Sequence, residues 1–232
     1  MKTLGLIGGI SYHSTATYYT LINKQVSELA GANHAAKLVL YSVNYNDFKL
    51  LQSNNDWKTI ATMLSEIAIK LQNAGADCIV LCCNTAHKIA AELKAKINIP
   101  FLHIADETAK EVAKHNMKKL ALLGTKFIME DPFFSTCLGN YGIDTILPGK
   151  DEQEVIHNTI LNELAKGFLS DESRNKIRSI IQNLKESGAE AVILGCTELG
   201  LFLHEAECEV KFFDTLNIHA KAAADFALST TD

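Results

Sequence analysis

The stretch GADCIVLCC (residues 75–83) joins a glycine to a short apolar run that ends in two adjacent cysteines. It returns as GAEAVILGC (188–196), which puts Cys83 and Cys196 in register at an offset of 196 − 83 = 113 residues. A short, continuous apolar run is typical of a strand that is buried on both faces of a parallel sheet. The repetition therefore predicts one kind of strand that occurs twice, each time with a thiol at its end.

Short apolar runs of this kind alternate along the chain with longer segments of helical period. In one such segment, Tyr18, Ile22, Val26 and Leu29 are spaced to form one buried helical face that ends before Gly31. The alternation predicts an α/β protein with parallel sheets. The eight expected strands cover residues 4–9, 37–43, 77–83, 101–104, 120–124, 144–148, 191–196 and 210–213.

The repeat extends beyond the cysteine strands, because KTLGLIG (2–8) matches KKLALLG (118–124). We therefore expect two copies of one four-stranded unit, related by a pseudo-two-fold axis. The expected boundaries place residues 1–100 and 214–232 in an N-terminal α/β domain, and residues 101–213 in a C-terminal one.

Composition narrows the class of protein. The chain has 232 residues, 47% of them hydrophobic, and a formal net charge of −5 without a basic cluster, so we do not expect a nucleic-acid partner. The apolar stretch Leu4–Ile10 is too short for a membrane span or a signal peptide, which predicts a cytoplasmic protein without membrane contact. Six cysteines are too few for a disulfide framework, and we expect them to be free thiols.

Cys83 and Cys196 stand where a strand ends and a helix is expected to begin. In open α/β sheets the carboxyl ends of the strands face the ligand. Asn84, Thr85 and Thr197 are residues typical of helix starts, where free N–H groups attract anions and lower the pKa of a nearby thiol. We thus expect a reactive thiol beside a bound carboxylate in each copy.

If the two copies face each other, two thiols lie on opposite sides of one carboxylate-bearing carbon. One base would remove the α-proton and the other would deliver a proton to the opposite face, which inverts the stereocentre. The residues thus predict a racemase or epimerase that needs no cofactor.

Three motifs, GLIGG (5–9), CNTAH (83–87) and GCTELG (195–200), resemble the aspartate/glutamate racemase family, whose members work without pyridoxal phosphate. The resemblance covers essentially the whole chain, including ELAKG (163–167) and FDT (213–215), and is greatest to the aspartate and broad-specificity amino-acid racemase branch. It implies two similar Rossmann-like domains with the site between them, a homodimer, and a small-molecule amino-acid substrate.

By the same resemblance, Cys83 and Cys196 would be the catalytic cysteines, acting on the D- and L-enantiomer respectively. The positions that line the substrate site in similar proteins are Gln52, Asn84, Thr85 and Thr197, and Lys166 matches a lysine that contacts the substrate. We add Ser11 at the start of the first helix, and expect Gly8 and Gly9 to let the backbone approach the substrate.

Arginine occurs only at positions 174 and 178, so a bidentate arginine clamp on an acidic side chain is not expected from the first 173 residues. A lysine is a more flexible point charge. We therefore expect aspartate, and also glutamate, to be preferred, with some activity on other amino acids.

Other interpretations remain open at this level. Hydantoin racemases, maleate isomerases and arylmalonate decarboxylases share the scaffold, and a carboxylate-binding protein could retain the site without its chemistry. A zinc site at Cys82, Cys83 and His87 is not expected, because consecutive strand residues point to opposite faces. We expect His87 to lie on a helix surface or to support the site indirectly, and Cys78, Cys82, Cys137 and Cys208 to belong to the core.

Overall fold

The computed structural model describes residues 1–230, and its internal contacts divide the chain into two compact units. The first unit consists of Met1–His103 together with the residues from His219 onward, and the second of Ile104–Ile218. Within residues 1–230, no helix combines the length and the apolar character that a membrane crossing requires.

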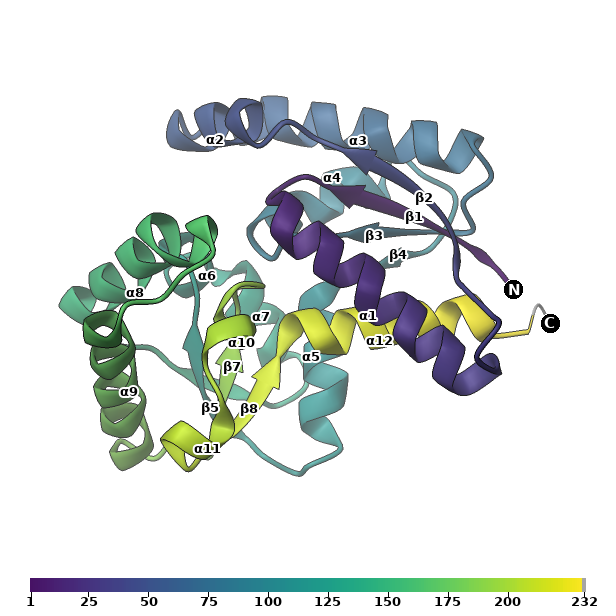
Figure 1. Cartoon of the computed structure of the whole chain (residues 1–232). Helices are drawn as coiled ribbons and strands as arrows, with labels where there is room; N and C mark the ends of the chain where they lie inside the picture. The colour runs from purple at the N-terminus through teal and green to yellow at the C-terminus, as the bar shows by residue number, and fades with distance from the viewer. Residues whose placement is uncertain (231–232) are drawn as a thin grey trace. The chain divides into compact units, whose positions relative to one another are not determined.

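The first unit contains a parallel sheet with the strand order β2-β1-β3-β4 (Figure 1). Helices α2 and α3 cover one side of this sheet and α1 lies on the other. Its elements are β1 (Thr3–Gly8), α1 (Tyr12–Ala30), β2 (Lys37–Ser42), α2 (Tyr45–Ser53), α3 (Trp57–Asn73), β3 (Cys78–Leu81), the 3₁₀ helix η1 (Thr85–Ile89), α4 (Ala90–Lys94) and β4 (Phe101–Leu102).

The second unit contains a parallel sheet with the strand order β6-β5-β7-β8. Its elements are α5 (Ile104–Ala113), β5 (Lys119–Leu123), α6 (Lys126–Met129), α7 (Pro132–Gly139), β6 (Asp144–Ile146), α8 (Lys150–Asn162), the 3₁₀ helix η2 (Leu164–Lys166), α9 (Asp171–Glu186), β7 (Ala191–Leu194), α10 (Leu199–Phe202), α11 (Glu205–Cys208), β8 (Lys211–Asp214) and α12 (Thr215–Leu228). From His219 onward, α12 belongs to the first unit.

The two sheets repeat the same strand order, in which the first strand of each copy lies between the second and the third. All eight strands expected from the apolar runs are present, with ends that differ by up to two residues. The predicted α/β class with two four-stranded parallel sheets is confirmed.

The strands of the second unit bury alternate residues in two different cores, as the two-residue period of a strand requires. Leu123 and Leu194 pack with the apolar faces of α8 and α9. Leu122 and Ile193, one residue earlier in each strand, pack with α5 and α7. A sheet covered on both faces explains why these strands read as continuous apolar runs.

One residue of the predicted apolar face of α1 is not buried. Tyr18, Ile22 and Val26 are inaccessible, but Leu29 is 61% exposed. A helix of 19 residues is about 28 Å long, whereas the six residues of β1 span about 20 Å. The last turn of α1 therefore has too little sheet beneath it, and the prediction for Leu29 is wrong.

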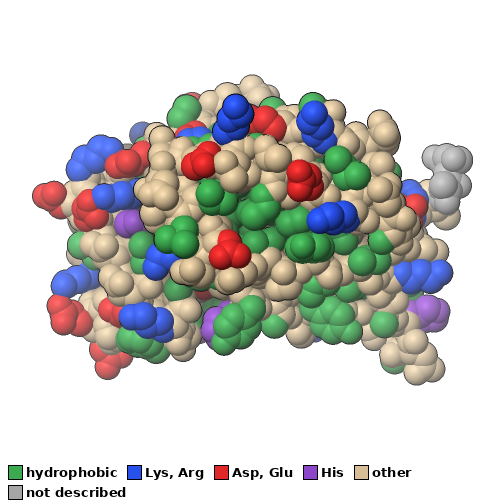
Figure 2. Space-filling view, turned by 90° about the horizontal axis from the view of Figure 1, so that it is seen from above, with side chains coloured by type: hydrophobic (Ala, Val, Ile, Leu, Met, Phe, Trp, Pro, Cys, Tyr) green, Lys and Arg blue, Asp and Glu red, His purple; other side chains and the backbone are tan. Residues whose placement is uncertain are grey.

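The outer side of α3 bears a shallow groove of about 590 Å³ that α4 also lines. Its floor is built from small and apolar side chains, and its rim carries charges of both signs. Figure 2 looks onto this side of α3 and shows apolar side chains (green) among basic and acidic ones. The lining residues are Trp57, Lys58, Ala61, Thr62, Ser65, Glu66, Ile69, Glu92 and Lys96.

Candidate functional site

Cys83 lies two residues beyond Leu81, the last residue of β3, and is half-buried against the core under α3 and α4. The ladder continues past the strand, because the N–H of Cys82 donates to the carbonyl of Ile7 at 2.9 Å. The hydroxyl of Ser14 in α1 donates to the carbonyl of Cys82 at 3.2 Å. These bonds fix the backbone before the thiol relative to the end of β1.

Ser11 is the N-cap residue of α1, and its side chain accepts from the N–H of Ser14 at 3.5 Å. It therefore stands beside the same strand ends as Cys83. Gly9 has a φ of +88°, and a Cβ there would overlap the backbone of Val43. The backbone of Gly9 thus approaches that of Val43 closely, and the expected approach of Gly8 and Gly9 to the substrate stays a prediction.

The helix expected after Cys83 begins as a 3₁₀ turn, η1, and becomes α-helical only at Ala90. Asn84 precedes this turn with helical backbone angles and makes no side-chain cap bond, so its expected capping role is wrong. Asn84 and Thr85 are both buried next to Cys83. The predicted apolar face of this helix is buried, as expected; it comprises Ala86, Ile89, Ala90 and Leu93.

Gln52 occupies the last turn of α2, on the connection that follows β2. Its side chain is half-buried. The preceding residue, Leu51, packs against the same apolar cluster as Cys83. Gln52 therefore belongs to the first unit, as do Ser11, Asn84 and Thr85.

Cys196 lies two residues beyond Leu194, the last residue of β7, and is 7% exposed. Its Sγ donates to Oε2 of Glu198 at 3.1 Å, and the hydroxyl of Thr197 donates to the same oxygen at 2.7 Å. Glu198 is itself buried. Sequence reasoning quoted this glutamate within GCTELG but gave it no role, although an acid two residues from a reactive thiol was the available signal.

The helix expected directly after Cys196 is much reduced. α10 begins only at Leu199 and has four residues. A helix dipole grows from aligned peptides, so a single turn supplies little of the field that was expected at this thiol. Within the second unit, the thiol of Cys196 contacts the Glu198 carboxylate.

Lys166 ends the 3₁₀ helix η2 and is exposed. Gly167 follows in the left-handed conformation, with a φ of +85°, which ends the helix. Lys166 belongs to the same unit as Cys196 and Thr197.

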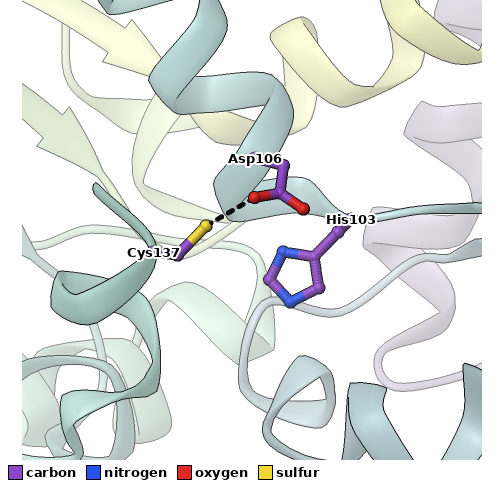
Figure 3. Close-up of side chains that lie close together, drawn as sticks. All are labelled: His103, Asp106 and Cys137. Atoms are coloured by element: carbon purple, nitrogen blue, oxygen red, sulfur yellow. Dashed lines mark hydrogen bonds between the residues drawn. The ribbon is translucent and has the colours of Figure 1, made fainter. Parts of the chain in front are cut away.

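The remaining cysteines lie in the cores, as predicted. Burial raises the pKa of Cys78 to about 12 and raises that of Cys82 further, so both stay protonated thiols. Cys208 is also buried, and burial raises its pKa as well. Cys137 of α7 donates to Oδ1 of Asp106 in the first turn of α5 at 2.8 Å (Figure 3).

His87 is 1% exposed, so the expectation of a helix-surface position is wrong. Its Nδ1 lies 2.8 Å from the carbonyl oxygen of Cys83.

The family described as Asp/Glu/Hydantoin racemase matches residues 7–223 of this chain. The broad-specificity amino-acid racemase RacX of Bacillus subtilis (strain 168) is 26% identical, over 97% of this chain and 98% of the relative.

Two solved structures are similar over nearly the full length. A structure titled as a putative Asp/Glu racemase from Yersinia pestis is 43% identical with a TM-score of 0.93, and covers 99% of this chain and 100% of its own. An aspartate racemase homologue from Pyrococcus horikoshii OT3 is 32% identical with a TM-score of 0.85, over the same shares. This chain therefore belongs to the Asp/Glu/hydantoin racemase family and is an enzyme of the racemase class.

Proposed function

We propose that this enzyme racemises an amino acid, preferably aspartate, by a two-base mechanism in which Cys83 and Cys196 act on opposite faces of the α-carbon. One thiolate removes the α-proton and the other thiol delivers a proton. No cofactor takes part in this scheme. By family resemblance, Cys83 serves the D-enantiomer and Cys196 the L-enantiomer.

The observation that carries the proposal is the equivalence of the two thiols. Each follows the third strand of its copy by two residues, after Leu81 in one sheet and after Leu194 in the other. Each of these strands pairs with the first strand of its own copy. Two equivalent thiols at equivalent strand ends are what a symmetric reaction with two interchangeable directions requires.

The proposed substrate contacts are Ser11, Gln52, Asn84 and Thr85 in the first unit and Thr197 and Lys166 in the second. For an acidic side chain, Lys166 is the proposed cation. Arg174 is less suited to this task, because it already donates to the carbonyl of Phe202 at 2.6 Å and pairs with Glu207. A flexible ammonium supports a preference for aspartate without strict exclusion of other substrates.

A broader substrate range is the second candidate. It is favoured by the Bacillus subtilis relative, named a broad-specificity amino-acid racemase, which aligns over 97% of this chain. The two candidates differ in the ratio of kcat/KM for aspartate to that for neutral amino acids.

We also propose a homodimer that uses the groove on α3 and α4. Lys58 and Lys96 share this groove with Glu66 and Glu92, so a second copy turned by a two-fold axis would meet it with opposite charges. Ile69→Lys should shift the sedimentation coefficient from dimer to monomer, whereas Lys24→Glu on α1 should not. A wild-type monomer would contradict this proposal.

The reaction is tested by incubating L- and D-aspartate in deuterium oxide and following both loss of the Cα proton and optical rotation. Cys83→Ala and Cys196→Ala should each abolish net racemisation while retaining exchange of one enantiomer. Cys82→Ala, which removes the adjacent core thiol, is the matched control and should racemise normally. Racemisation at the wild-type rate in Cys83→Ala would end the two-base scheme, and inactivity on aspartate with turnover of neutral amino acids would favour the broader range.

A further inference from the structure

The peptide of Cys83 is held by an unusual donor. In an α-helix the N–H of residue 87 would donate to the carbonyl of residue 83. Because η1 is a 3₁₀ turn, the N–H of His87 donates instead to the carbonyl of Asn84, at 3.1 Å. The imidazole of the same residue supplies the missing bond, with Nδ1 at 2.8 Å from the Cys83 carbonyl oxygen.

This bond fixes the tautomer of His87. A carbonyl oxygen only accepts, so Nδ1 carries the hydrogen and Nε2 presents a bare lone pair. Nε2 is buried and makes no hydrogen bond of normal geometry among residues 1–230, although the carbonyl of Leu102 lies close enough to act on the ring.

The surroundings keep this imidazole neutral. Burial is the main cause that holds the pKa of His87 well below its usual range, and the neighbouring His103 and His219 lower it further. The rings of Phe101, His103 and His219 lie with their centroids 5.3, 5.0 and 5.5 Å from that of His87. A neutral, enclosed imidazole acts as a fixed donor and does not exchange protons with solvent near pH 7.

The side chain of His219, which flanks the buried ring of His87, is itself held in place. His219 contacts the carbonyl of Leu102 through Nε2 at 3.0 Å, so Nε2 carries its hydrogen. Nδ1 of His219 then accepts from the hydroxyl of Tyr18 at 2.8 Å. Both nitrogens of His219 are thus engaged, and the ring that flanks His87 has little freedom to turn.

The second copy of the repeat has no equivalent of the His87 side-chain hydrogen bond. The residue that corresponds to His87 at the repeat offset of 113 is Gly200, since 87 + 113 = 200. A Cβ at Gly200 would overlap the carboxylate of Asp214. A histidine at position 200 therefore could not repeat the arrangement, and among residues 1–230 the equivalent position beside Cys196 carries no imidazole.

We propose that His87 is a positioning residue for Cys83: its Nδ1–H holds the Cys83 carbonyl, and so sets the direction of the thiol at the end of β3. This inference rests on the proposed role of Cys83 as a base. It predicts an asymmetry, because loss of the bond should impair the reaction of one enantiomer and spare the other.

Three substitutions separate the hydrogen bond from the filling of space. In His87→Asn the amide nitrogen takes the place of Nδ1 and can still donate to Cys83. In His87→Gln the amide lies one bond further out, at the place of Nε2, and His87→Leu fills space without a donor. Initial rates of α-proton exchange in deuterium oxide are measured for D- and L-aspartate separately, with circular dichroism to check folding.

His87→Leu and His87→Gln should lower kcat for exchange of D-aspartate by about 10- to 100-fold. Exchange of L-aspartate should stay within about threefold of wild type, and His87→Asn should restore most of the D-aspartate rate. Equal losses for both enantiomers, or an Asn variant as impaired as the Leu variant, would overturn the inference. Should the Leu variant not fold, the comparison of Asn with Gln decides.

The same assay on Cys83→Ala separates this inference from the proposed function. If Cys83→Ala loses D-aspartate exchange while His87→Leu retains it, only the positioning role is overturned. If Cys83→Ala itself retains D-aspartate exchange, Cys83 is not a base and both proposals are overturned.

Discussion

The thiol of Cys196 donates to the carboxylate of Glu198, two residues further along the chain, at a distance of 3.1 Å. Thr197 donates to the same oxygen, so the carboxylate is held in place by two neighbours. A negative charge beside a thiol favours the protonated form over the thiolate. We therefore expect the Glu198 carboxylate to oppose formation of the Cys196 thiolate.

Glu198→Gln should shift the alkylation of Cys196 by iodoacetamide to lower pH, because the neutral amide no longer opposes the thiolate. The rate is measured against pH by mass spectrometry of the Cys196 peptide. The Cys83 peptide in the same digest serves as an internal control and should be unchanged. An unshifted Cys196 profile would show that the carboxylate has no electrostatic effect on the thiol.

Lys166→Met should lower kcat/KM for aspartate by about 10- to 100-fold, which corresponds to about 1.4–2.8 kcal/mol of lost transition-state binding. Alanine and homoserine, which have no second carboxylate, should be affected far less. Lys176→Met is the matched control, because Lys176 is engaged with Glu172 on the surface of α9. Unchanged aspartate turnover in Lys166→Met would remove the proposed cation and favour the broader substrate range.

Extensive dialysis against a chelator in the presence of a thiol reductant should leave racemisation intact, because the proposed bases are thiols of the chain itself. Iodoacetamide or oxidation should abolish it. Activity is measured by the same optical rotation assay before and after treatment. Activity that returned only with added pyridoxal phosphate would contradict the cofactor-independent scheme.

The stability of the first unit should fall in weak acid. Burial lowers the pKa of His219 to about 4, from 6.5 in an exposed histidine. Between these values the unfolded chain binds a proton that the folded chain refuses, so the free energy of unfolding decreases as the pH falls. The slope for one histidine is at most about 1.4 kcal/mol per pH unit. His87, whose pKa is lowered in the same way, adds to it.

Urea unfolding at several pH values between about 7 and 4 measures this slope. His219→Gln, which keeps a donor for the Leu102 carbonyl, should flatten the dependence. A slope equal to that of wild type would show that His219 titrates at a similar pH in both states.

Asp214 should have the opposite effect on the pH dependence of the free energy of unfolding. Burial raises its pKa to about 6, from 3.8. The folded chain then holds a proton that the unfolded chain releases, so this contribution is complete below pH 3.8 and is lost as the pH rises through about 6. Asp214→Asn should therefore stabilise the protein more at pH 8 than at pH 4, relative to wild type, in the same urea titration. An equal effect at both pH values would contradict the raised pKa.

Part of this molecule could be predicted because the relevant patterns are local. The eight strands follow from short apolar runs, and the repeat of those runs predicted two four-stranded sheets. The positions of Cys83 and Cys196 relative to their strands follow from the same runs, since a strand end is marked by the change from apolar to polar residues. Element ends were less accurate, as in β3, which ends at Leu81.

Other features depend on contacts between distant parts of the chain. Helical spacing put Leu29 on the buried face of α1, but only the length of the sheet beneath it decides its exposure. The cap residues after Cys83 predicted an ordinary helix start, whereas the packed chain forms a 3₁₀ turn there. Local propensity is weaker than the packing that overrides it.

The sequence by itself thus determined the class of fold, the duplication and the place of the two thiols, because periodicity and repetition are written in neighbouring residues. Only the tertiary structure decided the environment of each thiol. Tyr18 meets His219 across 201 positions of the chain, and the enclosure around His87 exists only once that contact has formed. The orientation of Glu198 toward Cys196 likewise depends on the backbone after β7, where a short turn replaces the expected helix. Hydrogen bonds and burial set the charge of a side chain, and both arise from packing that no local pattern encodes.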